Sequence, residues 1–216
     1  HDALPIWHPG LYLMCRQHAS ETPGAWTLDG FLRAIAAAGD RAPLVWCVPI
    51  SNIDGVVQGD YGKDNFPYDL NRAWGQPPMR HETLVIQRDM AQWALRCRPV
   101  AGLDFHAPGA VESDGLYAFI PSAETDADAN AAAVRWGKRI AEQVGGFASK
   151  NFCRSGNYKS RWETPNYAVF ARTAYGCVGM SFETPYAVCG ETVMTRRDYQ
   201  TVGERMAAAV MEIANE

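Results

Sequence analysis

Apolar residues along this chain alternate between two spacings, one typical of strands and the other of amphipathic helices. Short runs of β-branched, aliphatic and aromatic residues predict strands at residues 11–15, 44–50, 100–106, 116–121 and 177–183. Between them, apolar residues recur every three or four positions and predict helices at residues 28–38, 79–98, 123–144, 166–174 and 197–215. Strands that alternate with helices form an α/β fold, so we expect three layers, α/β/α, around a mixed, mostly parallel sheet.

One long segment interrupts the alternation without dividing the chain. Residues 51–78 are rich in Gly, Asp, Asn and Pro and predict a long ordered loop, a kind of segment that often carries function. No internal repeat or low-complexity stretch separates the chain into parts, so residues 1–216 are predicted to form a single domain.

Composition and charge exclude several classes of protein. The 216 residues are 47% hydrophobic and 20% charged, the balance of a globular domain with a full core. The net charge of −4, without a cluster of Lys and Arg, argues against a nucleic-acid-binding surface. No apolar run is long enough for a transmembrane helix, and His1-Asp2 does not begin a signal peptide, so we expect no membrane partner.

The six cysteines are scattered, without a C-x-x-C pair or a dense framework. Cys15, Cys47 and Cys177 lie in apolar runs, where a thiol behaves as a small hydrophobic side chain. We therefore expect free thiols in a reducing compartment, and hence a cytoplasmic location.

Two polar motifs together hold the donor set of a catalytic zinc site. His18-Ala19-Ser20-Glu21 places an imidazole and a carboxylate three residues apart, so both can fall on one side of a helical turn. Asp104-Phe105-His106 supplies a second imidazole from the end of a predicted strand. Three protein ligands with a fourth position left for water are typical of zinc hydrolases, so His18, Glu21 and His106 are predicted to bind one Zn²⁺. A histidine buried in the core is the alternative interpretation of His106.

Glu183 ends the last predicted strand. Open α/β sheets place active-site residues at the carboxyl ends of their strands, and a carboxylate near the metal can take a proton from water and pass it to a leaving amine. Glu183 is therefore predicted to be the general base, with a solvated glutamate at a strand end as the alternative.

The order of the motifs resembles that of the zinc carboxypeptidases of the carboxypeptidase A type. After His-x-x-Glu come Asn52-Ile53-Asp54-Gly55, then Asp69-Leu70-Asn71-Arg72-Ala73-Trp74, then Asp-x-His, and finally a glutamate on a late apolar strand. The stretch C-R-Q-H-A-S-E-T-P-G-A-W at residues 15–26 is most similar to the cytosolic-carboxypeptidase branch. The resemblance runs from about residue 11 to about residue 186, and it implies a zinc enzyme that removes the C-terminal residue of a peptide.

The resemblance also implies roles for the motif at residues 69–72. Asn71 and Arg72 are expected to hold the free C-terminal carboxylate of the substrate, and Asp69 is expected to orient His18. A guanidinium forks onto a carboxylate with two hydrogen bonds, and a carboxylate behind a ligand imidazole fixes its tautomer. A surface ion pair with Asp69 is the alternative interpretation of Arg72.

Two features depart from the family pattern. The family has another arginine before the Asp-Leu-Asn-Arg motif that stabilises the reacting oxygen, and here the local candidate for that catalytic role is Lys63. The family's mobile tyrosine has two candidates, Tyr158 and Tyr167, and Tyr167 is also predicted to bind substrate because it lies where the branch lines its side-chain pocket. Arg161 or Arg172 could give that pocket a positive charge.

The resemblance further implies strands upstream of His18. Only residues 1–17 precede His18 here, so we expect upstream strands or an N-terminal domain to be missing from this chain.

Three functions remain open. The first is a metallocarboxypeptidase. The second is an amidohydrolase of the succinylglutamate desuccinylase and aspartoacylase type, which resembles the same fold and acts on small N-acyl amino acids with a free carboxylate. The third is a non-catalytic binding domain on a former peptidase scaffold, which the complete set of ligands, base and arginine disfavours.

Overall fold

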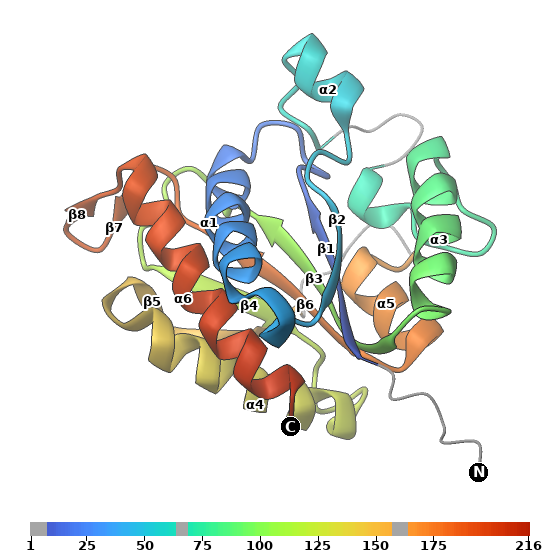
Figure 1. Cartoon of the computed structure of the whole chain (residues 1–216). Helices are drawn as coiled ribbons and strands as arrows, with labels where there is room; N and C mark the ends of the chain where they lie inside the picture. Colours follow the sequence, from blue (N-terminus) through green and yellow to red (C-terminus); the bar gives the residue numbers. More distant parts are fainter. Residues whose placement is uncertain (1–7, 64–68, 157–163) are drawn as a thin grey trace.

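A six-stranded sheet organises the fold in the computed structural model of the protein, which describes residues 8–63, 69–156 and 164–216 (Figure 1). The strands are β1 (Pro9–Cys15), β2 (Leu44–Val48), β3 (Arg98–His106), β4 (Leu116–Ile120), β5 (Ala148–Ser155) and β6 (Val178–Glu183). They lie in the order β2-β1-β3-β6-β4-β5, and the neighbours are parallel except β4 and β6, which are antiparallel. The predicted mixed, mostly parallel sheet is confirmed.

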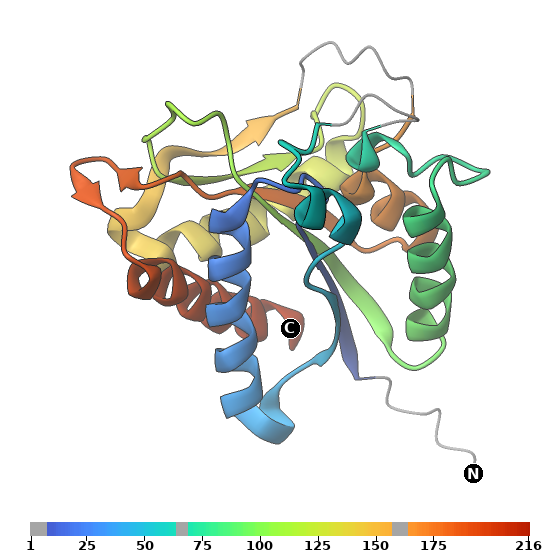
Figure 2. The ribbon, with the colours of Figure 1, turned by 90° about the horizontal axis from the view of Figure 1, so that it is seen from above.

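Helices cover both faces of this sheet and complete the three predicted layers (Figures 1 and 2). The helices are α1 (Thr22–Ala38), α2 (Ile53–Gln58), α3 (His81–Ala94), α4 (Ala127–Val144), α5 (Tyr167–Tyr175) and α6 (Arg196–Ala214). Helices α1, α4 and α6 pack on one face, and α3 and α5 pack on the other, each group around its own buried apolar cluster. The short strands β7 (Val188–Cys189) and β8 (Thr192–Val193) form a separate antiparallel ribbon.

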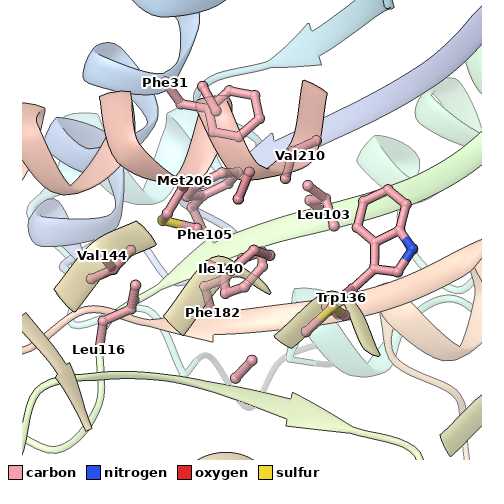
Figure 3. Packing of buried hydrophobic residues seen from close by; sticks show 14 of the residues in the cluster. Phe31, Leu103, Phe105, Leu116, Trp136, Ile140, Val144, Phe182, Met206 and Val210 are labelled. Carbon is pink, nitrogen blue, oxygen red and sulfur yellow. The ribbon is translucent and has the colours of Figure 1, made fainter. Parts of the chain in front are cut away.

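The larger core lies between the sheet and helices α1, α4 and α6 (Figure 3). At its centre the ring of Phe105 on β3 lies 5.6 Å from that of Phe182 on β6 and 5.7 Å from that of Phe31 on α1. Met206 and Val210 of α6 are fully buried in the same cluster. Burial of these side chains supplies the main favourable free energy of folding and holds the strand ends rigidly in place.

Helices α1 and α6 cross at two glycines. A Cβ on Gly30 would lie 2.0 Å from the carbonyl oxygen of Gln200, and one on Gly203 would lie 1.9 Å from the carbonyl oxygen of Thr27. Both obstacles are backbone atoms, which cannot rotate away. The close packing of the two helices therefore depends on the absence of a side chain at these positions.

We expect Gly203→Ala to lower the free energy of unfolding by about 2 kcal/mol, because the added methyl group forces two backbones apart. This net loss already includes the roughly 1 kcal/mol that alanine gains in helix propensity. Gly146→Ala is the matched control, since a Cβ there would meet no atom within 4 Å, and its stability should change by less than about 0.5 kcal/mol. Urea unfolding measures both; equal stability of Gly203→Ala and wild type would contradict the prediction.

Some elements differ from the prediction for local reasons. β5 was not predicted because its sequence is largely polar; it lies at the edge of the sheet, where few of its side chains enter the core. α2 lies inside the predicted loop 51–78, where Asn52 caps it by accepting a hydrogen bond from the Gly55 amide. α1 begins at Thr22, earlier than predicted, because Pro23 suits the first turn of a helix.

Two further expectations concern cysteine and the membrane. All six cysteines are free thiols, as predicted. Among the described helices, none has both the length and the apolar character that crossing a bilayer requires.

Candidate metal centre and active site

The His-x-x-Glu motif lies where β1 leaves the sheet. Arg16 follows the strand with a φ of +57°, in the left-handed region, and its Nε donates to the Ala19 carbonyl oxygen at 2.8 Å. This turn brings His18 and Glu21 back towards the strand end, with Glu21 directly before α1. Both side chains are buried. The chain therefore holds the imidazole and the carboxylate at the carboxyl edge of the sheet.

His106 ends β3, the parallel neighbour of β1. Cys15 pairs with Phe105, so the two strands end side by side and their motifs meet. His18 Nδ1 lies 2.8 Å from Glu21 Oε1, and His106 Nδ1 lies 2.6 Å from Glu21 Oε2. One ligand atom from each of the three residues lies within 4.8 Å of the others. The structure thus brings the three predicted metal ligands together.

The charge at this centre suits a divalent cation. Burial raises the pKa of the Glu21 carboxyl and lowers the pKa of the two imidazoles. The contacts of His18 with Asp69, of His106 with Asp104 and of both imidazoles with Glu21 outweigh it. The pKa of Glu21 lies well below its usual value, that of His106 lies well above it, and that of His18 is also raised. Three carboxylates, those of Glu21, Asp69 and Asp104, therefore favour positive charge at this centre, and Zn²⁺ supplies positive charge. Two ring nitrogens and a carboxylate also match the ligand set of catalytic zinc, so these residues fit the ion.

The Nε2 atom of each imidazole, which does not face Glu21, contacts a second carboxylate. His18 Nε2 lies 3.0 Å from Asp69 Oδ1, and His106 Nε2 lies 2.6 Å from Asp104 Oδ2. A carboxylate that accepts the Nε2 proton leaves Nδ1 as the metal-binding nitrogen. Asp69 therefore lies where it was predicted, and Asp104 has the equivalent place behind His106.

Asn71 and Arg72 lie in the short 3₁₀ turn Leu70–Arg72, which Asp69 caps by accepting from the Asn71 amide at 2.8 Å. Asn71 is buried, and its Oδ1 accepts hydrogen bonds from Gln17 Nε2 and from the Tyr167 amide, both at 3.1 Å. Arg72 is partly buried and donates to the Asn71 carbonyl oxygen at 2.7 Å. Both residues line the same cleft as the metal ligands.

Glu183 ends β6 and pairs in register with His106 on β3. It lines the cleft, and its burial there raises the pKa of its carboxyl group to about 7. A carboxyl group with such a pKa can both accept and release a proton near neutral pH. The geometry therefore places a suitable base beside the candidate metal ligands.

Lys63 also lies at this centre. Its Nζ is 4.0 Å from Glu21 Oε1, and its side chain is 54% exposed. The preceding Gly62 has a φ of +106°, and a Cβ on it would lie 2.1 Å from the Ala19 amide nitrogen. This close approach is what brings Lys63 to the cleft.

The predicted role of Tyr167 in substrate binding is wrong for this structure. Its side chain is fully buried; its hydroxyl donates to the Tyr12 carbonyl oxygen at 2.8 Å, and its ring packs against Trp74 at 5.0 Å. The neighbouring Asn166, Ala168 and Val169 line the cleft instead. Tyr167 begins α5 on the side that faces the sheet, so it belongs to the core.

Tyr158 and Arg161, which were also predicted candidates, lie outside the described residues. Arg172 lines the cleft and forms an ion pair with Asp126.

The cleft has a volume of about 550 Å³. The sequence does not predict the part of its wall that Tyr117 and Glu112 form. Tyr117 on β4 pairs in antiparallel register with Glu183, and its hydroxyl donates to Glu112 Oε2 at 3.2 Å. Both residues line the cleft. No motif identifies them, because only the pairing of β4 with β6 brings them to Glu183.

The chain is similar in sequence to cytosolic carboxypeptidases over part of its length. No protein-family model matches it. Cytosolic carboxypeptidase 1 of Gallus gallus is 28% identical over 107 residues, which cover 45% of this chain and 9% of that protein. Cytosolic carboxypeptidase 6 of Caenorhabditis elegans is 33% identical over 86 residues, covering 35% of this chain and 19% of that protein. The chain thus matches only a small part of these relatives.

Solved structures extend the similarity to almost the whole chain. A metallo-carboxypeptidase from Pseudomonas aeruginosa, solved with (2-guanidinoethylmercapto)succinic acid, has a TM-score of 0.71 at 19% identity and covers 99% of this chain and 59% of its own. A metallo-carboxypeptidase from Burkholderia cenocepacia has a TM-score of 0.69 at 21% identity, covering 96% and 57%. The succinylglutamate desuccinylase of Chromobacterium violaceum has a TM-score of 0.61 at 17% identity, covering 94% and 60%. At these identities the likeness shows a shared fold.

Proposed function

Because its relatives and structural neighbours support membership of a zinc carboxypeptidase-like family, we propose that this chain is a zinc-dependent metallocarboxypeptidase that hydrolyses the C-terminal bond of peptides. One observation carries the proposal: the three candidate ligands, Glu183 and Arg72 line a single cleft at the carboxyl edge of the sheet. A metal, a base and an anion-binding group are the parts that this reaction needs. The names of the cytosolic relatives also favour a cytoplasmic location.

Zinc held by His18, Glu21 and His106 would polarise the scissile carbonyl and lower the pKa of a bound water from about 15.7 towards about 7. Glu183 takes a proton from the attacking water, whose oxygen bonds to the carbonyl carbon. When the carbon–nitrogen bond breaks, Glu183 returns that proton to the leaving amine. Lys63 supplies positive charge near the carbonyl oxygen as negative charge develops on it.

Arg72 and Asn71 are proposed to bind the substrate's terminal carboxylate, with Arg72 as the principal contact. The Asn71 side chain already holds Gln17 and the Tyr167 amide, so it has less capacity for a further partner. A guanidinium can donate two parallel hydrogen bonds to a carboxylate. This contact would select peptides by their free C-terminus.

A peptide pair that differs only in a free or amidated C-terminus tests this selection. We expect wild-type kcat/KM to fall at least about 10²-fold on the amidated peptide, because a charged group that loses its partner costs several kcal/mol. Arg72→Ala should lose activity on the free peptide, discriminate little between the two, and keep its zinc. Arg88→Ala is the matched control, since Arg88 is exposed on α3. Equal wild-type hydrolysis of both peptides would exclude an exopeptidase.

A second candidate is an amidohydrolase that acts on small N-acyl amino acids, which the desuccinylase neighbour supports. Such a substrate also has a free carboxylate for Arg72, so the arginine does not separate the two functions. Turnover of N-succinylglutamate without turnover of any peptide in a panel would favour this alternative. Full zinc occupancy without turnover of either class would favour a binding domain.

A further inference from the structure

Gln17, immediately before His18, is a fully buried polar residue whose hydrogen bonds join the three motifs of the active site. Its Nε2 donates to Asp104 Oδ2 at 2.5 Å and to Asn71 Oδ1 at 3.1 Å. Its Oε1 accepts from Trp74 Nε1 at 2.8 Å. The Trp74 indole N–H can only donate, so it must face Oε1 of the Gln17 amide. The Nε2 end of the amide therefore faces Asp104.

Asp104 depends on these contacts because it is fully buried. Its Oδ2 lies within hydrogen-bond distance of Gln17 and His106, whereas its Oδ1 has no hydrogen-bond partner in the described part of the chain. Burial removes the hydration of a carboxylate, so one without enough donors moves towards whatever donor remains. Without the amide, His106 would be the remaining partner of Asp104, and the position of both side chains would be less restricted.

Asn71 gives the network a second connection. Its Oδ1 accepts from Gln17, while its Nδ2, 3.1 Å from His106 Nε2, is a second donor beside the Nε2 proton that Asp104 accepts. Asp104 is therefore the side chain through which Gln17 reaches the imidazole, and the Asn71 contact helps to hold the Gln17 amide in place.

We propose that Gln17 is a positioning residue that strengthens metal binding by fixing Asp104 behind His106. Gln17 acts through Asp104, the carboxylate that orients the imidazole. The inference rests on the proposed function, since it assumes that His106 binds zinc. Direct measurement of zinc binding tests the proposed function separately from the role of Gln17. A wild-type protein that binds no zinc would refute the proposed zinc enzyme, whereas a change confined to the Gln17 variants concerns only the role of Gln17.

Gln17→Met tests the proposal because methionine is of similar size but cannot donate to Asp104. We expect the zinc dissociation constant, measured by competition with a chelator, to rise about 10–100-fold, as is usual when a partner behind a ligand is lost. Gln87→Met is the matched control: Gln87 is also buried, but it accepts from Gln76 Nε2 at 2.8 Å and does not contact the metal motifs. Its zinc affinity should change less than about 3-fold.

Urea unfolding after chelator treatment distinguishes positioning from a general loss of stability. Both methionine variants should lose comparable stability, whereas only Gln17→Met should lose zinc affinity. If Gln17→Met does not fold, Gln17→Asn decides the question: it keeps an amide but is one methylene shorter and cannot reach Asp104 while it accepts from Trp74, so its zinc affinity should also fall at least about 10-fold. Wild-type zinc affinity in the folded Gln17 variant, or an equal loss in Gln87→Met, would overturn the proposal.

Discussion

His106→Ala should abolish zinc binding and peptide hydrolysis together. The substitution removes one of the three candidate ligands. Of the two imidazoles that contact the Glu21 carboxylate, only that of His18 remains. Two protein ligands are too few for a catalytic zinc site, so the metal should be lost during dialysis. Because the proposed reaction depends on metal activation of water, kcat/KM should fall by at least about 10³-fold.

Metal analysis after dialysis and peptide turnover measure the two effects separately. His81→Ala is the matched control, since His81 is exposed at the start of α3 and lies outside the cleft. It should retain both zinc and activity. Stoichiometric zinc at wild-type affinity in His106→Ala would refute the proposed ligand set.

Glu183→Gln should separate metal binding from chemistry. Glutamine keeps the size of the side chain but cannot take a proton from water, so kcat should fall by at least about 10²-fold while KM changes little. Zinc should remain stoichiometric, because Glu183 is not among the three grouped candidate ligands.

Steady-state kinetics and metal analysis of the same preparation test this prediction. Glu191→Gln, an exposed position just beyond β7, is the matched control and should behave as wild type. Near-wild-type turnover by Glu183→Gln would mean that another group transfers the proton. Loss of zinc from this variant would instead indicate that Glu183 helps to bind the metal.

The candidate ligands could be predicted because their signals are local. His18 and Glu21 are three residues apart, and His106 and Glu183 each end an apolar run that periodicity identifies as a strand. Active-site residues gather at the carboxyl ends of parallel strands, so their types and positions already indicated the chemistry. In the structure they meet because β1, β3 and β6 are neighbours: His106 and Glu183 end β3 and β6, and His18 and Glu21 follow the end of β1.

Tyr167 shows where local reasoning failed. Its neighbours in the sequence, Asn166 and Ala168, both line the cleft. Which residue of a helical turn faces the core depends on how α5 packs against the sheet, and here Tyr167 meets Trp74 and Tyr12. A shift of one position along the helix therefore separates a core residue from a cleft residue.

The alternation of elements, the inventory of metal ligands and the candidate base follow from the sequence by itself, because each depends on spacings within a few residues. Only the tertiary structure decided that β4 runs antiparallel to β6, which sets Tyr117 opposite Glu183, and that Gln17 reaches Asp104 and Asn71. These contacts join residues many positions apart, and their geometry depends on strand order, register and helix packing. No short stretch of sequence contains that information, since the whole core determines it.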